Sequence, residues 1–389
     1  MKSDLYVLAA KRTPVGSFGG SLKKLSAVQL GVLSSKAAIE SAQVSGEDFL
    51  QSIFGNVCSF SSADGPYLAR HIALRSELPI GVGAYNVNRL CGSGFEAILH
   101  ADRWANEEGW CLVGGAESMS QTPLIVREAR EGFKFARPPQ MIDSLWEALT
   151  DAYIKQPMGI TAENLAAEFS ISRQDCDEWS LKSHQRAARA ADAGFTKEEM
   201  LTLETLSHDE HIRRDSSIEK LQKLSPVFGG VTTAGNASGM NDAAASLIVS
   251  GSKFYEKWKT NSKRPALARI VASQVVGCDP AKMGLGPVQA VQKLCEETGW
   301  KLSEIDYVEI NEAFAAQILA VKKALQLSDE QLNPHGSGIS LGHPLGATGA
   351  RISTHVANLI GAGHYRRAIA GACIGGGQGI AVAFEAVNE

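Results

Sequence analysis

The chain has 389 residues, of which 44% are hydrophobic and 21% are charged, with a formal net charge of −4. This is the composition of a globular protein large enough for more than one core, and the charge gives no overall attraction for nucleic acid. No apolar run is long enough to span a bilayer, and the N-terminal segment enters a predicted strand too early to leave room for a cleavable signal. We therefore expect no nucleic-acid partner and no membrane insertion.

The first half alternates strand-like and helix-like segments. Apolar runs predict strands over residues 5–10, 49–57 and 110–115, and helical periodicity passes through residues 30–37. Strand, helix and strand of these lengths indicate a parallel sheet covered by helices.

Residues 118–240 differ from the first half in composition and in their predicted secondary structure. Charged residues crowd 128–137, prolines follow, and helices are predicted around 162–167 and 175–191. The pattern predicts a polar, partly helical insertion that does not continue the sheet, with 173–189 as a solvated helix face.

The strand-and-helix texture then returns. Residues 302–311 mirror 46–56, because in each an acidic helix end leads into a strand and a polar tip. Residues 342–351 open a helix, and 367–372 supply a strand ending in glycine. Two halves with this shared layout predict a duplicated α/β unit.

Cys91 stands where a predicted strand at 84–88 meets a predicted helix at 95–102. A helix N-terminus there would direct N–H groups and partial positive charge at the sulfur, which favours the thiolate. Gly92 and Gly94 would let the backbone and a bound acyl group come close. The alternative is a small buried hydrophobic residue, the usual role of a free cysteine.

The second half offers three more polar tips at sheet ends, where active sites of α/β proteins form. They hold Asn311, His343 and Cys373. His343 alone could be a helix cap or a satisfied core residue. The glycines at 375–377 indicate close approach of a ligand or use of free N–H donors, with a strand-end turn as the alternative.

All seven cysteines stand outside any C-x-x-C pair. Their odd number, without a secretory signal, favours free thiols in the cytoplasm, and a structural zinc site is not expected.

Together these features resemble the thiolase family over essentially the whole chain. The matching motifs, in order, lie at residues 12–16, 88–94, 114–119, 158–164, 233–239, 311–314, 342–344 and 373–375. Because so many motifs occur in the same order as in the family, the similarity is not explained by chance.

The resemblance implies chemistry for the polar tips. Cys91 would take up the acyl group as a thioester, His343 would accept its proton, and Cys373 would be the second acid/base that handles the α-proton. Asn311 would hold a water that, with His343, stabilises the enolate-side thioester oxygen. The N–H groups of Cys91 and Gly375 would form the other oxyanion hole.

The resemblance also implies substrates and architecture. Ser238, Met158, Phe314 and Ala234 would contact coenzyme A, and CoA thioesters would react without any metal or redox cofactor. The expected fold is the α/β thiolase fold, with duplicated βαβ-type halves in a layered α/β/α/β/α core. Its parts would be an N-terminal half at 1–117 plus about 241–263, an inserted loop domain at 118–240, and a C-terminal half at 264–389.

Three departures leave the acyl chain length open. Pro157 resembles broad-range 3-ketoacyl-CoA thiolases rather than short-chain enzymes, residues 333–338 lack a second Asn and a Gly-Gly pair, and the loop near 228–230 is trimmed. Residues 132–143 instead resemble the loop through which acetyl-CoA acetyltransferases tetramerise. We therefore expect a homo-oligomer, a dimer that assembles further into a tetramer.

Two other functions remain as alternatives. Decarboxylating ketoacyl synthases share the fold, but they lack the second cysteine and carry histidine where Asn311 falls. A non-catalytic lipid-binding protein of this fold is a weaker alternative, because all four chemical positions are intact.

Overall fold

The structure is a computed structural model that describes residues 2–44 and 46–387. Its largest feature is a ten-stranded mixed sheet with the order β12-β13-β14-β11-β1-β10-β5-β3-β4, in which β2 pairs with β10. These strands are β1 (Lys2–Arg12), β2 (Gly16–Ser17), β3 (Phe49–Gly55), β4 (Gly83–Val87), β5 (Trp110–Ser118), β10 (Asn241–Gly251), β11 (Ala268–Gly277), β12 (Tyr307–Ile310), β13 (Arg367–Ile374) and β14 (Gln378–Glu385).

Strand direction changes across the sheet. β3 is parallel to both β4 and β5, and β12 is parallel to β13. The central strands are antiparallel, including β1, which pairs with β10 on one side and β11 on the other. The expectation of a parallel sheet is therefore correct for these outer strands and wrong for the centre. Both strands that pair with β1 follow the insertion in the sequence. The β1–β11 pair joins the two halves.

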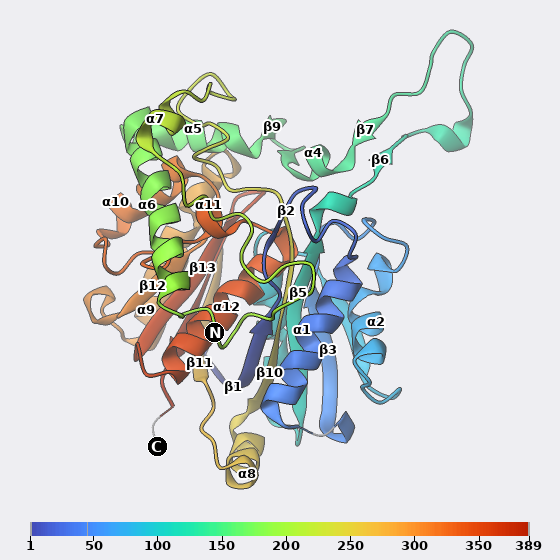
Figure 1. Cartoon of the computed structure of the whole chain (residues 1–389), viewed down its shortest axis with the longest axis vertical. Coiled ribbons are helices and arrows are strands. Elements are labelled where there is room, and N and C mark those ends of the chain that lie inside the picture. The colour runs from blue at the N-terminus through green and yellow to red at the C-terminus, as the bar shows by residue number, and fades with distance from the viewer. Residues whose placement is uncertain (1, 45, 388–389) are drawn as a thin grey trace.

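Helices cover the sheet and fill the space between the halves. α1 and α2 pack against β1, β3, β4, β5 and β10, α9 packs against β11, β13 and β14, and α12 touches strands of both halves (Figure 1). The helices are α1 (Ala27–Ala42), α2 (Leu68–Arg75), α3 (Ser93–Leu99), α4 (Ser144–Ala148), α5 (Met158–Glu168), α6 (Arg173–Asp192), α7 (Ile218–Gln222), α8 (Ser252–Ser262), α9 (Gly286–Thr298), α10 (Ala315–Leu325), α11 (Gly338–Leu341) and α12 (Leu345–Gly361). None of the helices in these described ranges is long and apolar enough to cross a membrane.

The repeated layout read from the sequence is present in the structure. A short 3₁₀ helix, Gly46–Asp48, leads into β3 and then Asn56, and a second, Leu302–Glu304, precedes β12 and then Asn311. Both asparagines are buried. The duplication therefore places two equivalent polar tips at the ends of two equivalent strands.

The core between the halves draws side chains from both. Ile53 and Phe95 of the first half pack in one cluster with Val356 and Phe384 of the second. Each such side chain contributes about 1.5–3 kcal/mol when it is fully buried. This shared core holds α3 and α12 in place, and the proposed site lies at the N-terminal ends of these two helices.

The insertion adds only small sheets of its own, β6 (Leu124–Ile125) with β7 (Ile142–Asp143) and β8 (Thr150–Asp151) with β9 (Gln156–Pro157). The segment between β6 and β7 projects away from the body of the molecule (Figure 1).

The interpretation of residues 173–189 as a solvated helix face is wrong for one side of α6. That side buries Trp179, Ser183 and Arg186. Trp179 Nε1 and Ser183 Oγ both donate to the buried Glu312 carboxylate, at 3.0 and 2.6 Å. The pattern of charged residues concealed this face because its buried members are themselves polar.

Candidate active site

Cys91 lies in a tight turn between β4 and α3. The preceding residue, Leu90, has a positive φ of 46°, which is uncommon for a residue with a branched side chain. Ser93 holds the turn, because its hydroxyl accepts from the Arg89 N–H at 2.8 Å and donates to the Leu90 carbonyl at 2.7 Å. The turn presents the Cys91 side chain at the N-terminal end of α3.

The protonation state of Cys91 differs from the sequence expectation. Burial raises the pKa of the thiol to about 11, although the N–H groups of Gly375 and Cys91 donate toward the sulfur and lower it. The expectation of a thiolate is therefore wrong for the free protein. Burial away from solvent destabilises the thiolate more than these two N–H donors stabilise it. A nucleophilic Cys91 needs a base.

His343 occupies the matching position before α12. Gly342 has φ 98°, and a Cβ there would lie 2.4 Å from the Asn241 side chain, so only glycine fits. The Asn241 Oδ1 accepts from the His343 N–H at 2.9 Å. Burial, with a smaller contribution from Arg351, lowers the pKa of His343 to about 3, so the imidazole is neutral near pH 7.

The two imidazole nitrogens have different surroundings. Nδ1 lies 2.7 Å from the Thr348 hydroxyl. Nε2 is buried and has no hydrogen-bond partner among the described residues. His343 therefore has one nitrogen engaged with the protein and one available to a reacting group.

Glu117 joins the first half of the molecule to α12. Its carboxylate accepts from the Gly346 N–H at 2.8 Å, in the first turn of the helix, and from the N–H groups of Val57 and Cys58. Burial raises the pKa of Glu117 to about 7 despite these donors. A carboxylate at a helix N-terminus is favourable, so Glu117 fixes the end of α12 that carries His343.

A small cavity of about 60 Å³ lies among these elements. Of the residues predicted to form the site, those on its wall are Cys91, Met158, Ser238, Phe314, His343 and Gly375. Cys373 is fully buried and packs with Met158 and Phe314. Burial raises the pKa of Cys373 well above its ordinary value, and Cys91 raises it further, so the two thiols are close enough to influence each other.

Asn311 is buried at the end of β12, and neither polar atom of its side chain has a partner among the described residues. A Cβ on Gly338 would lie 2.6 Å from its Oδ1, so glycine leaves room for the amide. The neighbouring Glu312 accepts from Trp179 and Ser183 and so ties this strand end to α6. A buried amide without partners is available to a ligand.

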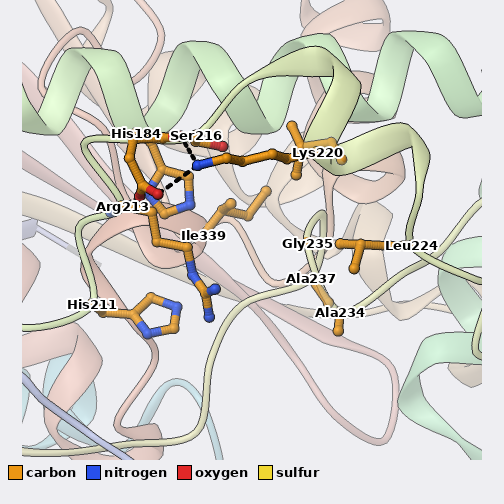
Figure 2. Close-up of a pocket in the computed structure, with 12 residues that line it drawn as sticks. His184, His211, Arg213, Ser216, Lys220, Leu224, Ala234, Gly235, Ala237 and Ile339 are labelled. Carbon is orange, nitrogen blue, oxygen red and sulfur yellow. Dashed lines mark hydrogen bonds and ion pairs between the residues drawn. The ribbon is translucent and has the colours of Figure 1, made fainter.

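A second, larger pocket of about 210 Å³ lies in the insertion. Figure 2 shows His184, His211 and Arg213 on one side of it and Leu224, Ala234 and Ala237 on the other. Burial lowers the pKa values of His184 and His211 to about 4. Near pH 7 the positive charge on this wall therefore comes from Arg213 and Lys220, the latter paired with Asp215 at 2.5 Å.

One short segment connects the two cavities. Ala234, Gly235 and Ala237 line the larger pocket, and Ser238 lines the smaller one. The Ser238 N–H donates to the Ala313 carbonyl at 2.9 Å, which anchors the segment beside Phe314. The predicted contact residues thus follow one path from the insertion to Cys91.

Four residues that organise the site were not singled out from the sequence: Glu117, Asn241, Glu312 and Thr348. Glu117, Glu312 and Thr348 lie within or beside the motifs at 114–119, 311–314 and 342–351. For Thr348 a usable signal existed, because a hydroxyl in the first turn of a helix can reach a side chain that precedes the helix. Asn241 had no such signal, because it lies 102 residues from His343.

Comparisons with known proteins agree with this architecture. Residues 5–253 match the family model described as thiolase, N-terminal domain, and residues 264–386 match thiolase, C-terminal domain. The chain belongs to the thiolase family.

Relatives with established names narrow the class further. The chain is 44% identical to the mitochondrial 3-ketoacyl-CoA thiolase of Mus musculus, with 97% of each chain covered, and 42% identical to the beta-ketothiolase BktB of Cupriavidus necator, with 100% of each covered. The solved structure of human mitochondrial 3-ketoacyl-CoA thiolase in complex with CoA has a TM-score of 0.95 at 44% identity and covers 99% of this chain and 98% of its own. The protein is an acyltransferase, a thiolase that moves an acyl group between CoA and acetyl-CoA.

Proposed function

We propose that Cys91 is the nucleophile, that His343 is its base and that Cys373 is the second acid/base. The observation that carries this proposal is the shared cavity wall of Cys91 and His343, with the Cys373 thiol packed behind it. In the first step the S–H bond of Cys91 breaks and its proton forms a new bond to His343 Nε2. In cleavage the sulfur attacks the 3-keto carbonyl carbon of the 3-ketoacyl-CoA, and in synthesis it attacks the thioester carbonyl carbon of acetyl-CoA. In the second step of cleavage the C2–C3 bond breaks, the acyl group stays on Cys91 as a thioester, and the Cys373 thiol protonates the departing acetyl-CoA enolate. In synthesis CoA leaves with the proton of the Cys373 thiol, and the resulting thiolate accepts an α-proton from a second acetyl-CoA.

Two sets of donors would stabilise the negative oxygens. The N–H groups of Cys91 and Gly375 point toward the Cys91 sulfur and so toward the carbonyl that it attacks. On the other side, Asn311 and protonated His343 would serve the thioester oxygen of the enolate, through a water held by Asn311. One such donor is worth about 2.7–4 kcal/mol in related acyl transfer.

For the substrate, the pantetheine arm of CoA would follow the segment from Ala234 to Ser238, between Met158 and Phe314. The nucleotide would occupy the larger pocket, with its phosphates near Arg213 and Lys220. The Arg213 side chain has no hydrogen bond or ion pair within the described residues, so it is available to a phosphate. No metal or redox cofactor takes part in these steps.

Paired variants of the two cysteines test the catalytic roles. Cys91→Ala should form no acyl-enzyme with acetoacetyl-CoA, as measured by mass spectrometry of the intact protein. Cys373→Ala should still be acylated at Cys91 but should lose exchange of the acetyl-CoA α-protons with solvent, followed by NMR in D₂O. Full condensing activity in Cys373→Ala would contradict the proposal and favour a decarboxylating synthase.

Acyl chain length forms a separate part of the proposal. The cavity beside Cys91 is small and bounded by Leu149, Met158 and Leu345, which supports short 3-ketoacyl chains as the best substrates. Thiolysis rates measured over a series of 3-ketoacyl-CoA lengths should fall as the chain grows. A rate that rises with length would show that this cavity does not limit the substrate.

We also propose a homo-oligomer, a dimer that assembles into a tetramer. β4 is an edge strand of the sheet, and Tyr67 and Ile80 beside it are exposed, which supports pairing with a second copy. The projecting segment between β6 and β7 exposes Phe133 and Phe135, which supports a further contact.

All seven cysteines are free, which supports a reducing compartment, and we propose the cytoplasm.

A further inference from the structure

Thr348 makes two hydrogen-bonding contacts with a single hydroxyl group. Its Oγ1 lies 2.7 Å from His343 Nδ1 and 3.0 Å from the Pro344 carbonyl oxygen. A hydroxyl has one proton to donate, and a carbonyl oxygen can only accept. The Thr348 proton therefore lies on the side of Pro344, and the lone pair of Oγ1 faces the imidazole.

We propose that Thr348 is a positioning residue that holds His343 in the tautomer with the proton on Nδ1. This inference rests on the proposed role of His343 as the base for Cys91. With the Nδ1–H donated to Thr348, Nε2 keeps its lone pair. That nitrogen is the buried atom without a partner among the described residues, and His343 shares the cavity wall with Cys91.

The opposite arrangement fails on two counts. If Thr348 donated to Nδ1, no proton would lie between the Thr348 hydroxyl oxygen and the Pro344 carbonyl oxygen, and two acceptors would face each other. Nε2 would then carry a proton as a buried donor without an acceptor, which costs about 1–3 kcal/mol. In that tautomer Nε2 also has no lone pair with which to remove the Cys91 proton.

The tautomer matters because the proton transfer depends on it. In the transfer the Cys91 S–H bond breaks and an N–H bond forms at Nε2, which leaves a thiolate and an imidazolium. The imidazolium still donates its Nδ1–H to Thr348, so this hydrogen bond persists and becomes charge-assisted. The same bond fixes the ring plane, because Thr348 is fully buried in the first turn of α12.

The test compares three threonine variants in one helix. Thr348→Val keeps the shape and removes the hydroxyl, and Thr348→Ser restores it. Thr354→Val is the matched control, because Thr354 is also buried in α12 and its hydroxyl has no partner among the described residues. Circular dichroism and thermal melting establish that each variant is folded.

The first readout is alkylation of Cys91 by iodoacetamide over a range of pH, with the modified residue identified by peptide mass spectrometry. We expect Thr348→Val to react at least about tenfold more slowly at pH 7, because correct proton transfer contributes about 10²–10⁴-fold. Thr348→Ser and Thr354→Val should behave like the parent protein. The kcat of Thr348→Val should fall with little change in KM.

The second readout is the ¹⁵N spectrum of the His343 imidazole, assigned by its loss in His343→Asn. The parent protein should show a protonated Nδ1 and an unprotonated Nε2, and Thr348→Val should lose this single pattern. A protonated Nε2 in the parent protein would overturn the inference. Equal damage in Thr348→Ser and Thr348→Val would do the same.

A His343→Ala arm separates this inference from the proposed function. If Cys91 reacts equally fast in His343→Ala and in the parent protein, the role of His343 as base is wrong. If His343→Ala slows the reaction and Thr348→Val does not, only the role of Thr348 is wrong.

Discussion

The three reactive side chains of the proposed site share one property, which is that burial disfavours their charged forms. Burial raises the pKa values of Cys91 and Cys373 and lowers the pKa of His343 to about 3. The resting site therefore holds two thiols and a neutral imidazole. In the proposed mechanism, charge arises only when a proton moves between these groups, and the surrounding N–H groups and Asn311 would stabilise it at that moment.

The same effect of burial makes a prediction for His184, whose pKa is lowered to about 4 by burial, His211 and Arg213. The unfolded chain binds this proton near pH 6.5, so the stabilisation from neutral His184 is complete above that pH and is lost as pH falls toward 4. Between pH 7 and pH 4.5 the free energy of unfolding should therefore fall by about 2 kcal/mol less in His184→Asn than in the parent protein. Urea unfolding at both pH values measures this difference.

The exposed His208 gives the control, as His208→Asn. Its side chain is exposed, so this variant tests whether removal of any histidine flattens the pH dependence. An equal flattening in both variants would mean that burial of His184 is not the cause.

At the scale of elements, the decisive contact is the crossing of α3 and α12. A Cβ on Gly94 would lie 2.5 Å from the Ala350 backbone nitrogen, and a Cβ on Gly349 would lie 2.3 Å from the Phe95 backbone nitrogen. Each helix thus presents glycine to the backbone of the other. Because Cys91 precedes one helix and His343 precedes the other, this close crossing sets how near the two side chains lie.

Gly94→Ala tests the crossing. Alanine is favoured over glycine in a helix by about 1 kcal/mol, but here its methyl group meets backbone that cannot move aside. We expect the free energy of unfolding to fall by about 1–3 kcal/mol, the usual cost of overpacking. Chemical denaturation measures this change, and kcat should fall with it because Cys91 and His343 are displaced.

Gly81→Ala is the control, because a Cβ at Gly81 meets nothing within 4 Å and its φ is not positive. It should be close to neutral. If Gly94→Ala were as stable as Gly81→Ala, the crossing would have more room than the structure shows.

The elements also show what the sequence could and could not predict. Strands such as β3, β5 and β13, and the polar tips that follow strands, were predicted correctly because apolar runs and glycines are local signals. The role of Gly94 was not, since the sequence suggested an acyl group as its neighbour and the structure places α12 there. The antiparallel pairs of β1 and the buried side of α6 were also missed. Each depends on segments more than 100 residues away, which local patterns do not register.

Within the site, local reasoning reached the side chains at strand and helix ends but not those that hold them. Cys91 and His343 are reactive side-chain types beside glycine or proline, and Asn311 directly follows a predicted strand. Asn241 and Glu312 are ordinary polar residues whose importance comes only from tertiary contacts with His343 and α6. The thiolate expected at Cys91 was wrong for the same reason, because the depth of burial is a property of the folded molecule.

At the scale of the whole molecule, buried charges attach the insertion to both halves. Arg12 of β1 binds Glu199 at 2.7 Å and Asp209 at 2.7 and 3.0 Å, all three groups being buried. Glu199 also binds His355 of α12 at 2.8 Å. Interactions of this kind stabilise one arrangement strongly because any single partner left alone is a buried, uncompensated charge.

Arg12→Met should therefore lower the free energy of unfolding by about 3–5 kcal/mol, because it removes the guanidinium that both Glu199 and Asp209 contact and leaves Asp209 with no cationic partner in this group. Arg12→Lys keeps the charge but cannot form the paired contact with Asp209, so an intermediate loss is expected and the comparison remains possible if Arg12→Met does not fold. Lys36→Met is the matched control, since the Lys36–Glu77 pair is exposed and should contribute little. Urea unfolding of the variants, with limited proteolysis of the insertion, measures both effects. If Arg12→Met and Lys36→Met unfolded alike, the insertion would be held by its apolar contacts, and the position of the pocket around Arg213 would not depend on this buried charge.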